Sequence, residues 1–151
     1  MDVRIGLQLY SVRQSLASDP WGTLAKIAEV GFTRLEAANH NARNDPGVGF
    51  GVPSTQLRSQ LGELGLSIMG CHINPLHLDI LPRALDYQAE LGNTQIGCDI
   101  EFYPNGDRDF VLGRCEVFNE SVSSPASAGC GSITTTTSRS SSGWATTTST
   151  T

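Results

Sequence analysis

Side chains able to bind a substrate or move a proton stand where several short apolar segments end. Gln8 and Tyr10 close the first segment, Glu36 lies near the end of the second, and His72 directly follows the third. Ionisable and hydrogen-bonding groups that converge in a cleft are typical of an enzyme site. We predict that Gln8, Tyr10, Glu36 and His72 bind a substrate, and the sequence assigns no catalytic residue.

Each of these residues also has a purely structural interpretation. The Tyr10 ring could pack at the mouth of a barrel with its hydroxyl in water. Glu36 could be a solvated acid, although its neighbours Leu35 and Ala37 are apolar. A single His after an apolar run is more often a hydrogen-bonded structural residue than a base or a ligand. The sequence leaves both interpretations open.

Four further polar residues are weaker candidates. Asp99 and Glu101 follow the fourth apolar segment and have the least support from their surroundings. His40 and His77 stand in predicted loops, where we expect them to be structural or solvated.

Four strand-then-helix units position these side chains. The predicted strands are Val3–Leu9, Phe32–Ala37, Ser67–Cys71 and Thr94–Cys98. The predicted helices are Asp19–Val30, a segment that begins at Ser54, Ile80–Leu91 and Asp107–Asn119. Asp19 and Ser54 are good N-cap residues, and Pro20 suits the first helical position. The Asn-, Gly- and Pro-rich stretch Asn39–Pro53 is predicted to be a long loop.

The helix ends repeat one pattern. Gly31, Gly65 and Gly92 each follow a Glu-Val or Glu-Leu pair and precede a predicted strand. A Gly at this point lets a helix stop in a left-handed turn. Strands joined by helix-length connections run parallel, which leaves a doubly wound sheet or a (β/α) barrel.

The dinucleotide-binding pattern GxGxxG does not follow the first predicted strand, which favours the barrel. We therefore predict an α/β fold made of the first four βα units of a parallel (β/α)8 (TIM-type) barrel. Reactive groups of such barrels gather at the carboxyl ends of the strands, where the four substrate-binding candidates stand.

Composition and charge exclude several classes of function. The net charge is −5 at pH 7 and the basic residues form no cluster, which disfavours nucleic acid and anionic membranes as partners. The sequence has neither an apolar run of signal-peptide type nor one of about 20 residues that would span a membrane. The four cysteines form no CxxC pair and are predicted to be reduced thiols of a cytoplasmic protein.

The motifs IGLQLYSVR, DPWGTLAKIAEVGFTRLEAA and STQLRSQLGELGLSIMGCHI resemble the opening of the sugar phosphate isomerase/epimerase group. Phe118-Asn119-Glu120 resembles the same xylose isomerase-like barrels, so the resemblance covers most of residues 3 to 120. By position, Glu36 and His72 match pocket-lining residues of the first half of these barrels.

The resemblance implies an eight-stranded barrel that holds a divalent metal (Mn, Mg, Co or Zn) and a keto-sugar or polyol. The implied reaction moves a proton between carbons next to a carbonyl, with the metal stabilising the enediolate oxygens. The family's usual ligands, two Glu, an Asp and a His, come from later strands. We therefore expect no metal ligand within residues 1 to 120 and no metal bound by this chain.

Composition changes sharply after residue 120. Residues 121–151 contain 19 Ser or Thr and a single charged residue, Arg139. One interpretation is a disordered, low-complexity Ser/Thr-rich tail, either a linker or a glycosylated stalk.

The interpretation that we favour is out-of-frame translation. Codons built from the third base of one residue and the first two bases of the next permit Glu-Arg-Gly-Leu-Arg-Phe for Ala126–Ser132 and Tyr-His-Asn-His for Ser132–Thr136. Phe and Glu are permitted next. The sequence encoded in this shifted frame resembles a helix end followed by the family's fifth strand. The Glu that closes this sequence resembles the family's first metal ligand. The slip would lie between Glu120 and Ala126.

Two functions are compatible with the sequence. The first is a truncated, inactive amino half of a metal-dependent sugar isomerase or epimerase. Such a half barrel has open strand edges and is expected to self-associate. The second is a non-catalytic α/β binding or assembly module with a flexible Ser/Thr arm. An endonuclease-type DNA-repair barrel ranks last, because the sequence lacks early His-rich zinc signals and a basic surface.

Overall fold

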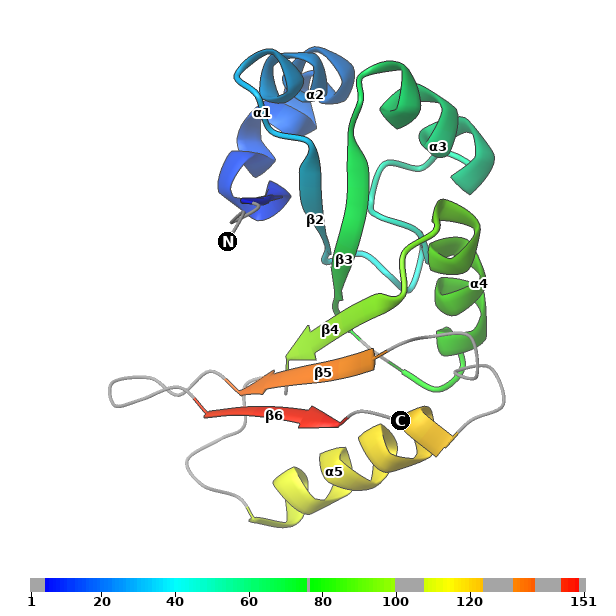
Figure 1. The fold of residues 1–151 in the computed structure, drawn as a ribbon. Coiled ribbons are helices and arrows are strands. Elements are labelled where there is room, and N and C mark those ends of the chain that lie inside the picture. Colours follow the sequence, from blue (N-terminus) through cyan, green and yellow to red (C-terminus); the bar gives the residue numbers. More distant parts are fainter. Residues whose placement is uncertain (1–4, 76, 100–107, 124–131, 138–144, 150–151) are drawn as a thin grey trace.

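The computed structural model describes residues 5–75, 77–99, 108–123, 132–137 and 145–149 (Figure 1). Within these ranges, one sheet has the strand order β1-β2-β3-β4-β5-β6. The strands are β1 (Leu7–Gln8), β2 (Arg34–Asn39), β3 (Ser67–Ile73), β4 (Gln95–Asp99), β5 (Ser132–Thr137) and β6 (Ala145–Ser149). The helices are a 3-10 turn η1 (Leu9–Val12), α1 (Arg13–Ser18), α2 (Pro20–Glu29), α3 (Ser54–Glu63), α4 (Leu81–Leu91) and α5 (Arg108–Ser123).

Strands β1 to β4 are parallel, and a helix lies in the chain between each pair. This arrangement confirms the predicted α/β repeat. Figure 1 shows the strand direction turning from near vertical at β2 to a shallow slope at β4, while α3 and α4 lie along one side of the strands. A right-handed twist that accumulates in this way is what bends a parallel sheet towards a barrel.

The helix ends follow the predicted glycine pattern. Gly31, Gly65 and Gly92 have φ values of 97°, 67° and 81°, in the left-handed region. At the start of α2, Asp19 is the N-cap and its carboxylate accepts a hydrogen bond from the Gly22 N–H at 2.9 Å. Pro20 is the first residue of that helix, as predicted.

Two local predictions differ from the structure. The first strand is only two residues long, because the chain turns into η1 and α1 directly after Gln8. Ser54 begins α3 but does not cap it, and Pro53 occupies the N-cap position. The Ser54 hydroxyl instead donates a hydrogen bond to a Glu90 carboxylate oxygen, so it joins α3 to α4.

The Ser/Thr-rich segment contains two short strands of the sheet. Ser132–Thr137 forms β5, which pairs parallel with β4, and Ala145–Ser149 forms β6, which pairs antiparallel with β5. Threonine is β-branched and favours extended backbone, so runs of Thr can add strands to an existing sheet edge.

The hydrophobic core lies between the sheet and its helices. Leu35 and Ala37 of β2 and Ile68 and Ile73 of β3 are buried on this side. They pack in one cluster with buried apolar residues of the helices, namely Leu24, Ile27, Leu57, Leu61, Leu81, Ala84 and Leu85. On the opposite side of the sheet Met69 is 41% exposed. The described part of the chain therefore covers one face of β2 and β3 and leaves the other open.

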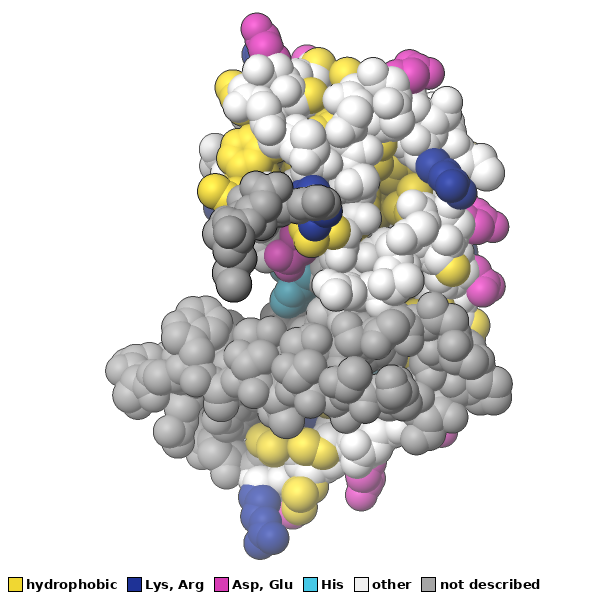
Figure 2. Space-filling view, in the orientation of Figure 1, with side chains coloured by type: hydrophobic (Ala, Val, Ile, Leu, Met, Phe, Trp, Pro, Cys, Tyr) yellow, Lys and Arg dark blue, Asp and Glu magenta, His cyan; other side chains and the backbone are white. Residues whose placement is uncertain are grey.

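The surface carries charges of both signs. Figure 2 shows Lys or Arg and Asp or Glu side chains scattered over this face without a continuous basic patch. Among the described residues, no helix is long and apolar enough to cross a membrane.

Two glycines at the end of α3 should respond oppositely to substitution by Ala. Gly65 has a positive φ, so Gly65→Ala is expected to lower the free energy of unfolding by about 1–2 kcal/mol. Gly62 lies inside α3, and Gly62→Ala should raise it by about 0.5–1 kcal/mol. An added Cβ would meet no atom within 4 Å at either position, so backbone conformation alone decides the sign.

Urea denaturation of the two variants and the original chain measures both changes. A shift of the same sign in both variants would contradict the left-handed helix end at Gly65.

Candidate functional site

The open face of the sheet carries two of the predicted site residues side by side. Gln8 in β1 is paired in register with Glu36 in β2, and Glu36 is paired with Gly70 in β3. The Gln8 Nε2 donates a hydrogen bond to the Glu36 Oε1 at 3.0 Å. Because Gly70 has no side chain, it leaves space next to the carboxylate: a Cβ built there would lie 3.7 Å from the Glu36 Cγ.

A β-bulge brings His72 to the same face. Leu35 pairs with Ile68 but Glu36 pairs with Gly70, so Met69 is an extra residue in β3. Beyond the bulge, Ala38 pairs with His72 and His72 pairs with Gly97. Side chains alternate between the faces of a strand, so without the extra residue His72 would point towards the helices.

These residues line a cavity of about 500 Å³ on the open face. In Figure 2 a histidine and an acidic side chain are visible in the recess of this face. The lining residues are Gly6, Leu7, Gln8, Glu36, Met69, Gly70, Cys71, His72, Gln95, Ile96 and Gly97. The volume is in the range of small-molecule sites, and amide, carboxylate and imidazole groups can hydrogen-bond to hydroxyl groups of a ligand.

Cys71 lies beside this cavity, but its thiol is buried. Burial, together with the nearby Glu36 charge, raises the pKa of the Cys71 thiol to about 12. The thiol therefore stays protonated at neutral pH and is a poor nucleophile.

Tyr10 lies at the edge of the site, and the His40 ring contacts both the Tyr10 ring and the His72 ring. The ring centroids of Tyr10 and His40 are 5.0 Å apart, and those of His40 and His72 are 5.9 Å apart with nearly parallel planes. Gln8, Tyr10, Glu36 and His72 thus gather at the carboxyl ends of three neighbouring strands. His40 follows the end of β2 and lies in a loop, as predicted, but the sequence did not place it beside the Tyr10 and His72 rings.

The residue before His40 fixes the start of the loop that follows β2. The buried Asn39 Nδ2 donates to the carbonyl oxygens of Asp45 at 2.7 Å and Gly47 at 3.0 Å. Its Oδ1 accepts from the Asn41 N–H at 2.9 Å. The Asp45 carboxylate accepts from the Gly47 and Gly51 N–H groups at 2.9 and 2.8 Å. These bonds order the backbone on both sides of the His40 imidazole.

The weaker candidates lie elsewhere or outside the described residues. Asp99 ends β4, but its side chain is not described, and Glu101 lies outside the described residues. The His77 carbonyl accepts the Ile80 and Leu81 N–H groups at 3.2 and 3.1 Å at the start of α4.

The donor set does not fit a divalent metal in the part of the chain that the structure describes. Within it, no group of three or more His, Cys, Asp or Glu side chains is placed to hold an ion. The Glu36 carboxylate is bonded to the Gln8 amide. Catalytic metal sites in proteins commonly use three protein ligands.

Comparison with known proteins identifies the fold. No family model matches the chain, and no curated protein matches it. Solved structures do match, and two of them are each described as a sugar phosphate isomerase/epimerase from Parabacteroides distasonis ATCC 8503. One has a TM-score of 0.68 over 86% of this chain at 23% identity, and the other has 0.59 over 81% at 23% identity.

This chain spans about half the length of each solved structure, with 50% of either covered. The predicted resemblance is thus confirmed at the level of the fold. The parallel strands and their helices match the first half of a TIM-type barrel.

Thiol chemistry tests the burial of Cys71. At pH 8 we expect iodoacetamide to modify the exposed Cys115 readily and to leave Cys71 and Cys98 unmodified, because both are buried. The stability that follows from the raised pKa of Cys71 is complete below about pH 9 and is lost as the pH rises from 9 towards 12.

Peptide mapping by mass spectrometry locates the modified residues, and the same reaction in urea is the control. Equal labelling of Cys71 and Cys115 in the folded protein would contradict the burial.

Proposed function

We propose that this chain is the amino-terminal half of a sugar isomerase/epimerase-type barrel and that its open face binds a keto-sugar or polyol. The observation that supports this proposal is the Gln8–Glu36 hydrogen bond beside the 500 Å³ cavity that His72 also lines. A carboxylate accepts hydroxyl protons, an amide both donates and accepts, and an imidazole does either according to its protonation. This combination suits a ligand with several hydroxyl groups.

The proposed binding mode assigns a role to each residue. The second oxygen of Glu36 accepts from a ligand hydroxyl while Gln8 holds the first. His72, one layer further along β3, contacts a neighbouring oxygen, and Tyr10 forms the rim together with His40.

We also propose that the chain does not catalyse epimerisation. In complete barrels of this kind we expect a divalent metal (Mn, Mg, Co or Zn) to be held by later strands and to stabilise an enediolate. The residues described here do not form such a metal site, and we propose that the chain binds no metal. An open sheet face also admits water, which weakens the electrostatic interactions that would stabilise a developing charge.

Glu36→Gln tests the binding site. It keeps the side-chain size but removes the charge, so we expect ketose affinity, measured by calorimetry with D-fructose, to fall about tenfold. Glu63→Gln, at the end of α3, is the matched control and should leave the affinity unchanged.

Incubation of the 151-residue chain with a ketose and Mn²⁺ tests the proposed inactivity. We expect no epimer to form. Robust turnover would refute the inactivity, and equal affinities of the two Glu variants would refute the site.

We further propose that residues 121–151 are translated out of frame and that the frameshift lies between Glu120 and Ala126. Two observations support this proposal: the abrupt change to Ser and Thr at residue 121, and the strand-like amino-acid sequence that the shifted frame can encode. We assign the chain to the cytoplasm, because its four cysteines form no CxxC pair.

The alternative function is a non-catalytic α/β binding or assembly module with a Ser/Thr-rich arm. It is favoured by one observation, the two strands β5 and β6 that this segment adds to the sheet.

A half barrel exposes strand edges and an open face, so the first proposal implies self-association of the purified chain.

Resequencing of the coding DNA across codons 118 to 130, with light scattering of the purified protein, separates the two functions. We expect a one-base discrepancy and a concentration-dependent mixture of oligomers. A clean in-frame sequence together with a monodisperse, folded monomer would favour the assembly module.

A further inference from the structure

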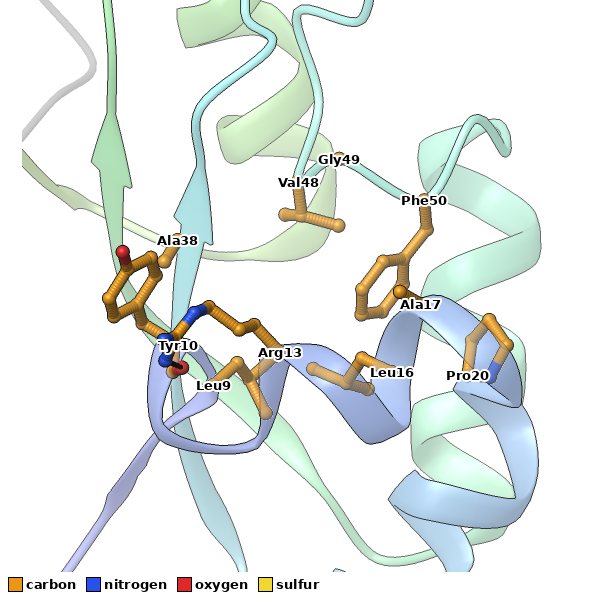
Figure 3. A pocket seen from close by; sticks show the side chains of 10 residues that line it. All are labelled: Leu9, Tyr10, Arg13, Leu16, Ala17, Pro20, Ala38, Val48, Gly49 and Phe50. Carbon is orange, nitrogen blue, oxygen red and sulfur yellow. Dashed lines mark hydrogen bonds between the residues drawn. The ribbon is translucent and has the colours of Figure 1, made fainter.

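A second cavity, of about 300 Å³, lies between α1, the end of β2 and the loop before α3. Its lining residues are Leu9, Tyr10, Arg13, Leu16, Ala17, Pro20, Ala38, Val48, Gly49 and Phe50 (Figure 3). None of these residues lines the cavity around Glu36. The second cavity is therefore distinct from the cavity of the polyol site proposed above, and Tyr10 at the rim of that site lies between the two.

The floor of this cavity is apolar and well ordered. Leu9, Leu16 and Val48 are buried, and Val48 is only 2% exposed. Figure 3 shows Val48 and Phe50 pointing towards Leu16 across the cavity. The Phe50 ring packs edge-on against Trp21 with centroids 6.2 Å apart, which fixes its orientation.

The other end of the cavity holds one cation. The Arg13 guanidinium lies 4.3 Å from the Tyr10 ring centroid, and its Nη1 donates to the Tyr10 carbonyl at 3.0 Å. Figure 3 shows Arg13 and Tyr10 together at this end. A guanidinium has five N–H donors, so this single bond leaves others for a ligand. In the part of the chain that the structure describes, no lining residue carries a carboxylate.

We propose that this cavity binds a small monocarboxylate with an aromatic or branched apolar body. The body fills the space between Leu16, Val48 and Phe50, and the carboxylate is bound by Arg13. Guanidinium and carboxylate have matching planar geometry and form strong, charge-assisted hydrogen bonds. Because Arg13 is already held by the Tyr10 ring and carbonyl, little side-chain freedom is lost when the anion binds.

The shape and chemistry also distinguish this ligand from a sugar. A polyol needs hydrogen-bond partners along its whole length, and the floor formed by Leu9, Leu16 and Val48 provides none. An apolar body at the same place removes carbon surface from water.

Methyl-detected NMR titration of the 151-residue chain with benzoate tests the proposal. We expect saturable shifts of the Leu9, Leu16 and Val48 methyl groups. Arg13→Gln should weaken benzoate binding at least about tenfold, because it removes a charge-assisted hydrogen bond. Arg83→Gln, which removes an exposed arginine of α4, is the matched control and should not change the affinity.

Two further measurements keep the outcome decisive. Benzyl alcohol, which lacks the negative charge, should bind at least about tenfold more weakly than benzoate. Ala17→Phe keeps Arg13 but fills the cavity from α1, and it should abolish binding. Shifts that do not saturate, or equal affinities of the original chain and Arg13→Gln, would overturn the proposal. Glu36→Gln should leave benzoate binding intact, so this test and that of the polyol site fail independently.

Discussion

The pairing register between β2 and β3 is the constraint on which the site depends. Leu35, Ala37 and Asn39 of β2 are buried on the helix side, as are Ile68, Cys71 and Ile73 of β3. In β3 the buried positions change from an even number, Ile68, to odd numbers, Cys71 and Ile73. This change requires one extra residue between them, which is Met69. A one-residue slip would turn the His72 imidazole towards the helices and expose apolar side chains that now form the core. Core packing and site geometry are therefore determined by the same register.

The open face gains its polar character from this register. Gln8, Glu36 and His72 stand on the face that the described helices do not cover, and the small residues Gly70, Ala38 and Gly97 stand beside them in neighbouring strands. Small side chains between polar ones leave space above the sheet that a ligand can enter. In a complete barrel the same face would be the interior, where layers of side chains from alternate strands fill the space. A polar layer with gaps at the carboxyl ends fits a ligand site better than a packed core.

Much of the fold could be predicted from the sequence because it depends on local chemistry. A Gly after Glu-Val or Glu-Leu marks a helix end, and Asp19 with Pro20 marks a helix start, since both act within one turn of chain. The bulge at Met69 could not be predicted, because the sequence Ser67–Cys71 does not indicate the register in which this strand pairs with β2. His40 lies in a loop as predicted, but its place beside the Tyr10 and His72 rings could not be predicted for a related reason: Asn39 hydrogen-bonds to a loop that folds back from six to eight residues away. Long-range pairing decides both features.

The row of rings between the two cavities follows from these same constraints. Arg13 lies on one side of the Tyr10 ring, and His40 lies near that ring and stacks with His72. A guanidinium favours the electron-rich face of a phenol, and aromatic rings at these separations attract one another. The row therefore forms a wall between the cavity that His72 lines and the cavity that Tyr10 lines, with the Arg13 cation at its outer end.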